Sequence, residues 1–148
     1  MVQYNYMVLK VFKVIWIISL LAVCAVFFYA YSTLQEQVGL GMDIPTISKT
    51  LFFYSFISII AVFNGIAFGA LKIFGDYWKR AWFYGLLTTL HLFLSATFIF
   101  LAIINSNERY DYGNLGPTVV GSFVIFILWI LAFPVIPLLT RSFSEKRI

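Results

Sequence analysis

His91 is the residue whose type and position could do chemistry. It is the only histidine among the 148 residues, and it lies in an apolar stretch, 81–104, that contains no Asp, Glu, Lys or Arg. His91 follows Arg80 by eleven residues. That distance is roughly 16 Å along a helix, close to the middle of a bilayer. An imidazole at that depth suits a proton relay, a haem or metal ligand, or a polar substrate contact.

Three polar side chains accompany His91. Thr88 and Ser95 share its face of a helix, because side chains three and four residues apart lie one above another. Asn64 lies at a similar depth in the preceding apolar stretch, where a tight antiparallel hairpin would let it hydrogen-bond to His91. The cluster either lines a path through the protein or stabilises helix packing around a neutral imidazole. We favour the packing interpretation.

Binding of a haem cofactor would need a ligand from another chain. One histidine cannot supply both axial ligands of a bis-histidine haem, so haem bound through His91 requires a second ligand from elsewhere. Cys24 is the only cysteine, which excludes an intrachain disulfide. We therefore predict no catalytic residue, no metal site and no cofactor, and we retain His91 as the one candidate ligand.

Four apolar stretches must position these side chains: 14–34, 51–71, 81–104 and 118–140. Each has about the 20 residues that a helix needs to cross a hydrocarbon core of about 30 Å. Hydrophobic residues make up 62% of the chain, charged residues 11%, and the mean hydropathy is +0.95. Continuous apolar runs in lipid become helices, since the backbone must satisfy its own hydrogen bonds. The sequence predicts an all-α integral membrane protein: one domain, 1–148, with four transmembrane helices in an antiparallel up-down bundle.

The basic residues predict the orientation. Eight of the ten Lys and Arg residues fall on one predicted side: Lys10, Lys13, Lys72, Lys79, Arg80, Arg141, Lys146 and Arg147. The positive-inside rule places that side, and with it both termini, in the cytoplasm. Lys79 and Arg80, in the short middle loop, are expected to meet anionic lipid head groups. The net charge of +4 is then a topology signal, so we expect no nucleic-acid partner and predict a multi-pass protein of a bacterial inner (plasma) membrane.

The second apolar stretch carries a helix-packing pattern. Ala61, Gly65 and Gly69 recur every four residues, and small side chains at this spacing let another helix approach closely. The pattern does not say whether that helix belongs to this chain, to a second copy or to another transmembrane subunit.

Three functions from different classes follow from these features. The favoured one is a non-catalytic accessory, structural or assembly subunit of a larger membrane complex, because the four stretches lack buried carboxylates and basic groups. The first alternative is a small oligomeric channel or carrier with a polar path around His91 and Asn64. The second is an intramembrane redox or lipid-modifying enzyme with His91 as ligand or base. The sequence thus favours a protein that is not an enzyme, but it does not decide whether the chain has catalytic activity.

Overall fold

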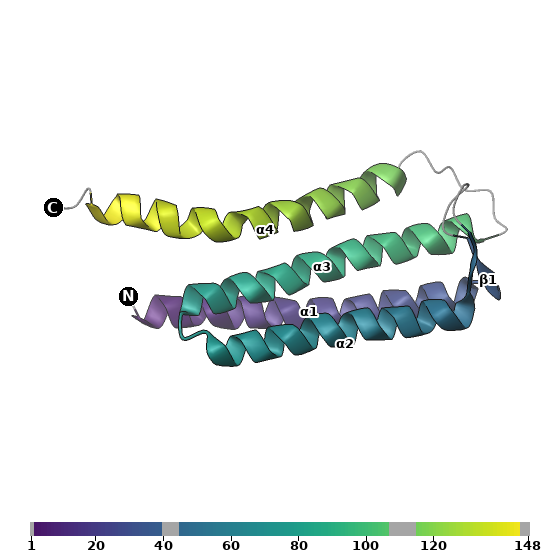
Figure 1. The fold of residues 1–148 in the computed structure, drawn as a ribbon, viewed down its shortest axis with the longest axis horizontal. Coiled ribbons are helices and arrows are strands. Elements are labelled where there is room, and N and C mark those ends of the chain that lie inside the picture. Colours follow the sequence, from purple (N-terminus) through teal and green to yellow (C-terminus); the bar gives the residue numbers. More distant parts are fainter. Residues whose placement is uncertain (1, 40–44, 107–114, 146–148) are drawn as a thin grey trace.

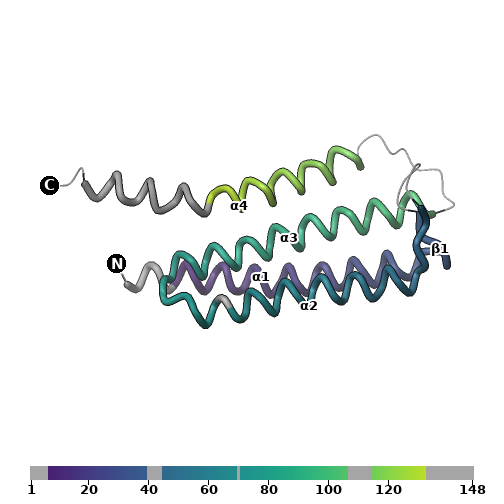
Figure 2. Tube along the Cα trace, viewed as in Figure 1, coloured from purple at the N-terminus to yellow at the C-terminus, as the bar shows by residue number. Residues whose placement is uncertain are grey.

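The computed structural model describes the backbone of residues 2–39, 45–106 and 115–145, and the side chains of 7–39, 45–69, 71–106 and 115–132 (Figure 2). Most of the described residues are helical. Its helices are α1 (Val2–Thr33), α2 (Lys49–Ile73), α3 (Tyr77–Ile104) and α4 (Leu115–Glu145). All four are long and apolar enough to cross a membrane, which confirms this part of the prediction. Each helix extends beyond the predicted apolar stretch at one end or at both.

Consecutive helices run in opposite directions, so α1 begins and α4 ends at the same end of the molecule (Figure 1). The packing is not that of a symmetric bundle. Helix α3 lies in the middle, packs along the length of α1 on one side and against α4 on the other, and makes fewer contacts with α2. As a result, α3 contributes the largest share of the buried residues, and α4 buries little apart from Ser122.

Local sequence explains where two of the helices begin. Ser48 precedes α2, and its hydroxyl oxygen accepts a hydrogen bond from the backbone N–H of Leu51 over 3.2 Å, as an N-cap does. Between α2 and α3 the chain turns through Phe74-Gly75-Asp76, and Asp76 takes the extended conformation typical of an N-cap. This short turn makes α2 and α3 an antiparallel hairpin.

An aromatic core joins α1, α2 and α3 near the end where α1 finishes. Phe27 is fully buried, its ring stacks on Phe56 with a centroid distance of 3.7 Å, and Phe98 meets it edge-on at 5.3 Å. Aromatic pairs of this kind contribute about 0.5–1.5 kcal/mol beyond the area that they bury. Helix α2 is therefore held here by ring contacts, although its backbone stays further from α3 than that of α1.

A small β-hairpin covers this end of the helices, which the all-α prediction did not include. β1 (Gln37–Val38) pairs with β2 (Ile47–Ser48) in antiparallel register, and the side chain of Val38 is fully buried. Asn105, just after α3, makes two hydrogen bonds to the chain that follows β1. Its Oδ1 accepts from the N–H of Gly39 over 2.7 Å, and its Nδ2 donates to the carbonyl of Gly39 over 2.9 Å.

Replacing Asn105 with alanine should release this hairpin from α3. The variant loses both bonds to Gly39 and a third to the carbonyl of Leu101, which together stabilise the fold by about 1.5–4.5 kcal/mol. We expect faster hydrogen exchange at the Gly39 amide, with little change in the middle of α3. Unchanged protection of Gly39 would show that Val38 burial alone holds the hairpin.

Candidate functional site: a buried polar network at His91

His91 lies in the interior of the helix assembly, between α1 and α2. Its side chain is 1% exposed, although it is polar. The ring nitrogen Nδ1 lies 2.9 Å from the hydroxyl of Ser19 on α1, and Nε2 lies 3.4 Å from the amide nitrogen of Asn64 on α2. The structure thus brings Asn64 and His91 together, and it adds Ser19 from a third helix.

Asn64 is held in one orientation by its other contacts. Its Nδ2 donates to the carbonyl of Ile60, one turn earlier in α2, over 2.9 Å. Its Oδ1 accepts from the indole Nε1 of Trp16 on α1 over 3.0 Å. The carbonyl of Ile60 can only accept and the indole can only donate, so the amide cannot be flipped without losing both bonds.

These bonds also assign the tautomer of His91. The Ser19 hydroxyl donates its only hydrogen to the carbonyl of Trp16 over 2.8 Å, so toward His91 it can only accept. The imidazole therefore carries its proton on Nδ1, and its Nε2 accepts from Asn64. In this arrangement both ring nitrogens are used by a neutral ring. A second proton on Nε2 would face the amide N–H of Asn64 and has no acceptor there.

Thr88 and Ser95, the two other members of the predicted cluster, do not join this network. The Thr88 hydroxyl donates to the carbonyl of Tyr84, and the Ser95 hydroxyl donates to the carbonyl of His91, each over less than 3 Å and within α3. Such bonds satisfy a hydroxyl within its own helix and require no second helix. Of the polar residues predicted to form one row along α3, Thr88 and Ser95 therefore hydrogen-bond within that helix.

Trp16 and Ser19 were not among the residues predicted from the sequence. Both stand three residues apart on α1, so they share one face of that helix. The only available signal was this pairing of two side-chain donors in an otherwise apolar segment. Nothing in the sequence of α1 indicates the depth at which it packs against α3.

The predicted packing row of α2 faces away from the other helices. Ala61, Gly65 and Gly69 are exposed, and a Cβ at either glycine would meet no other atom of the described chain within 4 Å. The core side of α2 carries Phe52, Phe56 and Ala67 instead. Within this chain, then, the row packs against no helix in the part that the structure describes, and the prediction stands only for a partner outside the chain.

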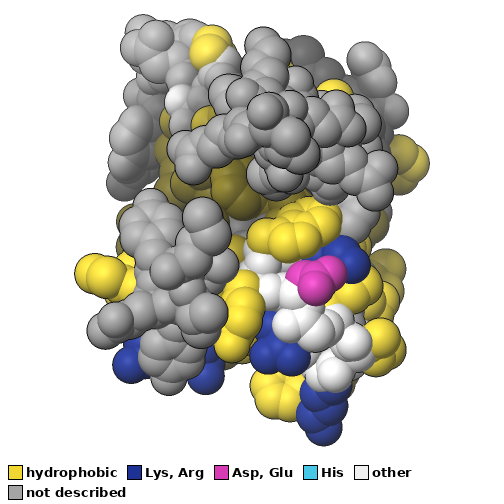
Figure 3. Space-filling model, turned by 90° about the vertical axis from the view of Figure 1, so that its left-hand side faces the viewer, with side chains coloured by type: hydrophobic (Ala, Val, Ile, Leu, Met, Phe, Trp, Pro, Cys, Tyr) yellow, Lys and Arg dark blue, Asp and Glu magenta, His cyan; other side chains and the backbone are white. Residues whose placement is uncertain are grey.

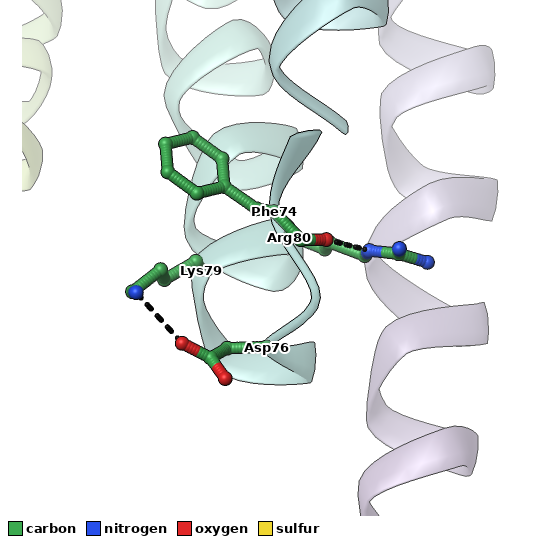
Figure 4. A network of polar contacts seen from close by, with 4 residues as sticks. All are labelled: Phe74, Asp76, Lys79 and Arg80. Atoms are coloured by element: carbon green, nitrogen blue, oxygen red, sulfur yellow. Dashed lines mark hydrogen bonds and ion pairs between the residues drawn. The ribbon is translucent and has the colours of Figure 1, made fainter. Parts of the chain in front are cut away.

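Lys79 and Arg80 lie in the first turn of α3 (Figure 4). The Nζ of Lys79 is 2.7 Å from a carboxylate oxygen of Asp76, and Nε of Arg80 donates to the carbonyl of Phe74 over 2.6 Å. Asp76 is exposed and Lys79 is partly exposed, and exposed pairs of this kind stabilise by about 0–1 kcal/mol. The bond from Arg80 to Phe74 closes the turn between α2 and α3.

The described residues hold no group of three or more His, Cys, Asp or Glu side chains that could bind a metal ion. The site consists of His91, its two ring partners Ser19 and Asn64, and Trp16, which bonds to Asn64. Every buried polar side-chain atom in the described part of the chain has a hydrogen-bond partner. The comparisons with protein-family models, with curated proteins and with solved structures gave no match to this chain.

Proposed function

We propose that this chain is a non-catalytic accessory, structural or assembly subunit of a larger membrane complex. It lies in a bacterial-type inner membrane with both termini in the cytoplasm, an orientation that follows from the positive-inside rule. Four long apolar helices support the membrane location, since they leave many large apolar side chains exposed. Lipid or neighbouring transmembrane helices cover such side chains.

The closed hydrogen bonding of His91 is the observation that carries the non-catalytic assignment. The one ionisable side chain at depth uses both ring nitrogens within the chain, toward Ser19 and Asn64. A haem or metal ligand needs a free lone pair on one of these nitrogens, and a wet path needs polar groups that face a cavity. The bonded arrangement supports a role in helix packing, which is the role of most intramembrane polar contacts.

The small residues on the outward face of α2, Ala61, Gly65 and Gly69, support an interaction with another membrane subunit. Gly65 and Gly69 weaken a helix by about 1 kcal/mol each relative to alanine when they make no packing contact. Their positions leave a shallow strip on the surface where a second backbone can approach. A protein that met only lipid would gain nothing from this strip.

Replacing Gly65 or Gly69 with leucine should remove the partner and leave the chain folded. The leucine side chain would lie on the outward face, where a Cβ meets no other atom of the described chain within 4 Å. We expect the stoichiometric partner seen after extraction in mild detergent to fall about tenfold or more, equivalent to about 1.4 kcal/mol. Mass spectrometry of the co-purified proteins measures this loss and identifies the partner.

Gly121→Leu is the matched control, because Gly121 in α4 is also an exposed glycine with open space around it. This variant should keep the partner. Two outcomes would contradict the proposal. Recovery of the wild type without any other protein, as a defined homo-oligomer, would favour a channel or carrier. Loss of transport or of haem absorption in a stably folded His91→Leu variant would favour the chemical roles of His91.

A further inference from the structure

The two halves of α2 are attached to the rest of the protein in different ways. In the first half, the ring of Phe56 stacks on Phe27 in the aromatic core. In the second half, among the described side chains of 57–69 and 71–73, Asn64 is the one that hydrogen-bonds to other helices. It bonds to Trp16 of α1 over 3.0 Å and lies 3.4 Å from Nε2 of His91 in α3. The polar attachment of this half of α2 therefore depends on one amide.

The hydrogen bonds around that amide fit only the neutral form of His91. Nδ1 donates to the hydroxyl of Ser19, and Nε2 accepts from Asn64. A proton on Nε2 needs an acceptor, and Asn64 can offer its Oδ1 only by turning its amide over. The turned amide loses its bonds to Trp16 and to the carbonyl of Ile60, and it places its own N–H groups against the indole N–H. Protonation of His91 therefore disrupts the attachment of α2 whether or not Asn64 turns.

The helices around His91 offer no carboxylate to pair with a protonated ring, since the stretches 14–34, 51–71, 81–104 and 118–140 contain no Asp or Glu. The nearest ionisable side chains, each five or more residues along its helix from Ser19, Asn64 or His91, are Lys13 and Cys24 of α1, Lys72 of α2 and Tyr84 of α3. The stretch 118–140 in α4 has none. Lys and Arg side chains lie at the surface of the end where α1 begins (Figure 3). A protonated ring is therefore stabilised only by water, which the closed helices exclude because His91 is 1% exposed.

We propose that His91, Asn64 and Trp16 form an acid-sensitive latch that holds the second half of α2 to α1 and α3. The latch is closed while the imidazole is neutral, and it opens when the ring takes up a second proton in contact with water. Gly65 and Gly69 lie on the opposite, outward face of α2, so this proposal does not depend on the partner proposed above.

The sign of the pH dependence follows from which state binds the extra proton. The closed latch has no acceptor for a proton on Nε2, whereas the open latch exposes the ring to water. An imidazole in water has a pKa of about 6.5. Opening is therefore nearly independent of pH above about 7.5, and it increases by up to about tenfold for each pH unit below about 6.

The test follows the indole N–H of Trp16 in the full chain, labelled with nitrogen-15 at tryptophan and histidine, in mixed micelles. This N–H is bonded to Asn64, so it exchanges with water when the latch opens. The indole N–H of Trp129 donates to the carbonyl of Trp82, away from His91, and serves as the reference for the direct effect of pH on exchange. We expect the exchange rate of Trp16 relative to Trp129 to rise about tenfold between about pH 7.5 and about pH 5.5.

A second measurement needs no variant, because His91 is the only histidine of the chain. The nitrogen spectrum of the imidazole then contains one pair of ring signals, which report directly where the proton lies. At neutral pH we expect a proton on Nδ1 and none on Nε2. A proton on Nε2 at that pH would overturn the bonding pattern and the latch with it.

His91→Gln is the decisive variant, because glutamine keeps a polar side chain that does not titrate. In this variant the relative exchange rate of Trp16 should not change with pH. Thr88→Val is the matched control on the same face of α3, and it should keep the tenfold rise, since the Thr88 hydroxyl bonds only to Tyr84. A constant ratio in the wild type, or the same rise in His91→Gln, overturns the proposal. If His91→Gln does not fold, the wild-type ratio and the nitrogen spectrum decide.

Discussion

Replacing Gly85 with alanine is expected to separate α4 from α3. A Cβ at position 85 would overlap the Cζ2 atom of Trp129 and lie 2.5 Å from its Cε2. The indole cannot move aside freely, because its Nε1 donates to the carbonyl of Trp82 over 3.0 Å, and the Trp82 indole donates back to the carbonyl of Trp129 over 2.9 Å. We expect a loss of about 2–3 kcal/mol, at the upper end of the usual cost of overpacking. Unfolding in mixed micelles measures it.

The remaining contacts of α4 explain why the loss should be local. In the described part of α4, the buried or half-buried residues that face α3 include Ser122, Phe126 and Trp129. Few other contacts of the described side chains 115–132 hold this helix, so protease cleavage in α4 should accelerate before cleavage in α1. Gly69→Ala is the control, since a methyl group there meets no other atom of the described chain. If Gly85→Ala costs as much stability in a Trp129→Leu background, where the indole ring is absent, as it does in the wild type, the clash is not the cause.

The four helices could be predicted from the sequence because their signal is local. A run of about 20 apolar residues needs no information about its neighbours to become a helix in lipid. The predicted stretch 81–104 and the helix Tyr77–Ile104 end at the same residue, since Asn105 and the polar residues that follow stop the apolar run. The start differs, because Lys79 and Arg80 are helical although their charges exclude them from the apolar run.

Packing between helices could not be predicted from the same signal. The row of small residues in α2 predicts a close contact, and the structure has its closest glycine contact elsewhere, at Gly85 in α3. Trp82 is 9% exposed and its indole donates to the carbonyl of Trp129 in α4, a contact that the apolar pattern does not indicate. In lipid, all apolar faces look alike, so only tertiary structure decides which of them touch.

The polar site could be predicted only in part, because the sequence gives the depth of a residue along its helix but not the register between helices. Equal depth in a hairpin follows from counting residues, which is why Asn64 and His91 could be paired in advance. The contribution of α1 depends on its register along α3, and Trp16 and Ser19 carry no sequence signal for that register. Thr88 and Ser95 share a face with His91, but a helical face says nothing about whether a hydroxyl bonds across helices or within its own.

Replacing Asn64 with leucine is expected to have the second large effect on stability. The change leaves two buried or half-buried groups without partners, the indole N–H of Trp16 and the Nε2 of His91. Hydrogen bonds between membrane helices contribute about 0.6–2 kcal/mol each, so the loss should be about 1–3 kcal/mol. Unfolding in mixed micelles measures this loss. Thr88→Val is the control and should cost little, since its hydroxyl bonds only within α3.

A double-mutant cycle tests whether these residues act as one network. His91→Leu alone removes the bonds to Ser19 and Asn64, and once it is made, Asn64→Leu has one partner fewer to lose. The double variant should therefore be more stable than the sum of the single losses predicts, by about 0.6–1.7 kcal/mol. Additive losses would mean that the 3.4 Å contact between Asn64 and His91 carries no energy. His91 would then have a free lone pair at Nε2, and the case for a ligand or a proton relay at this depth would return.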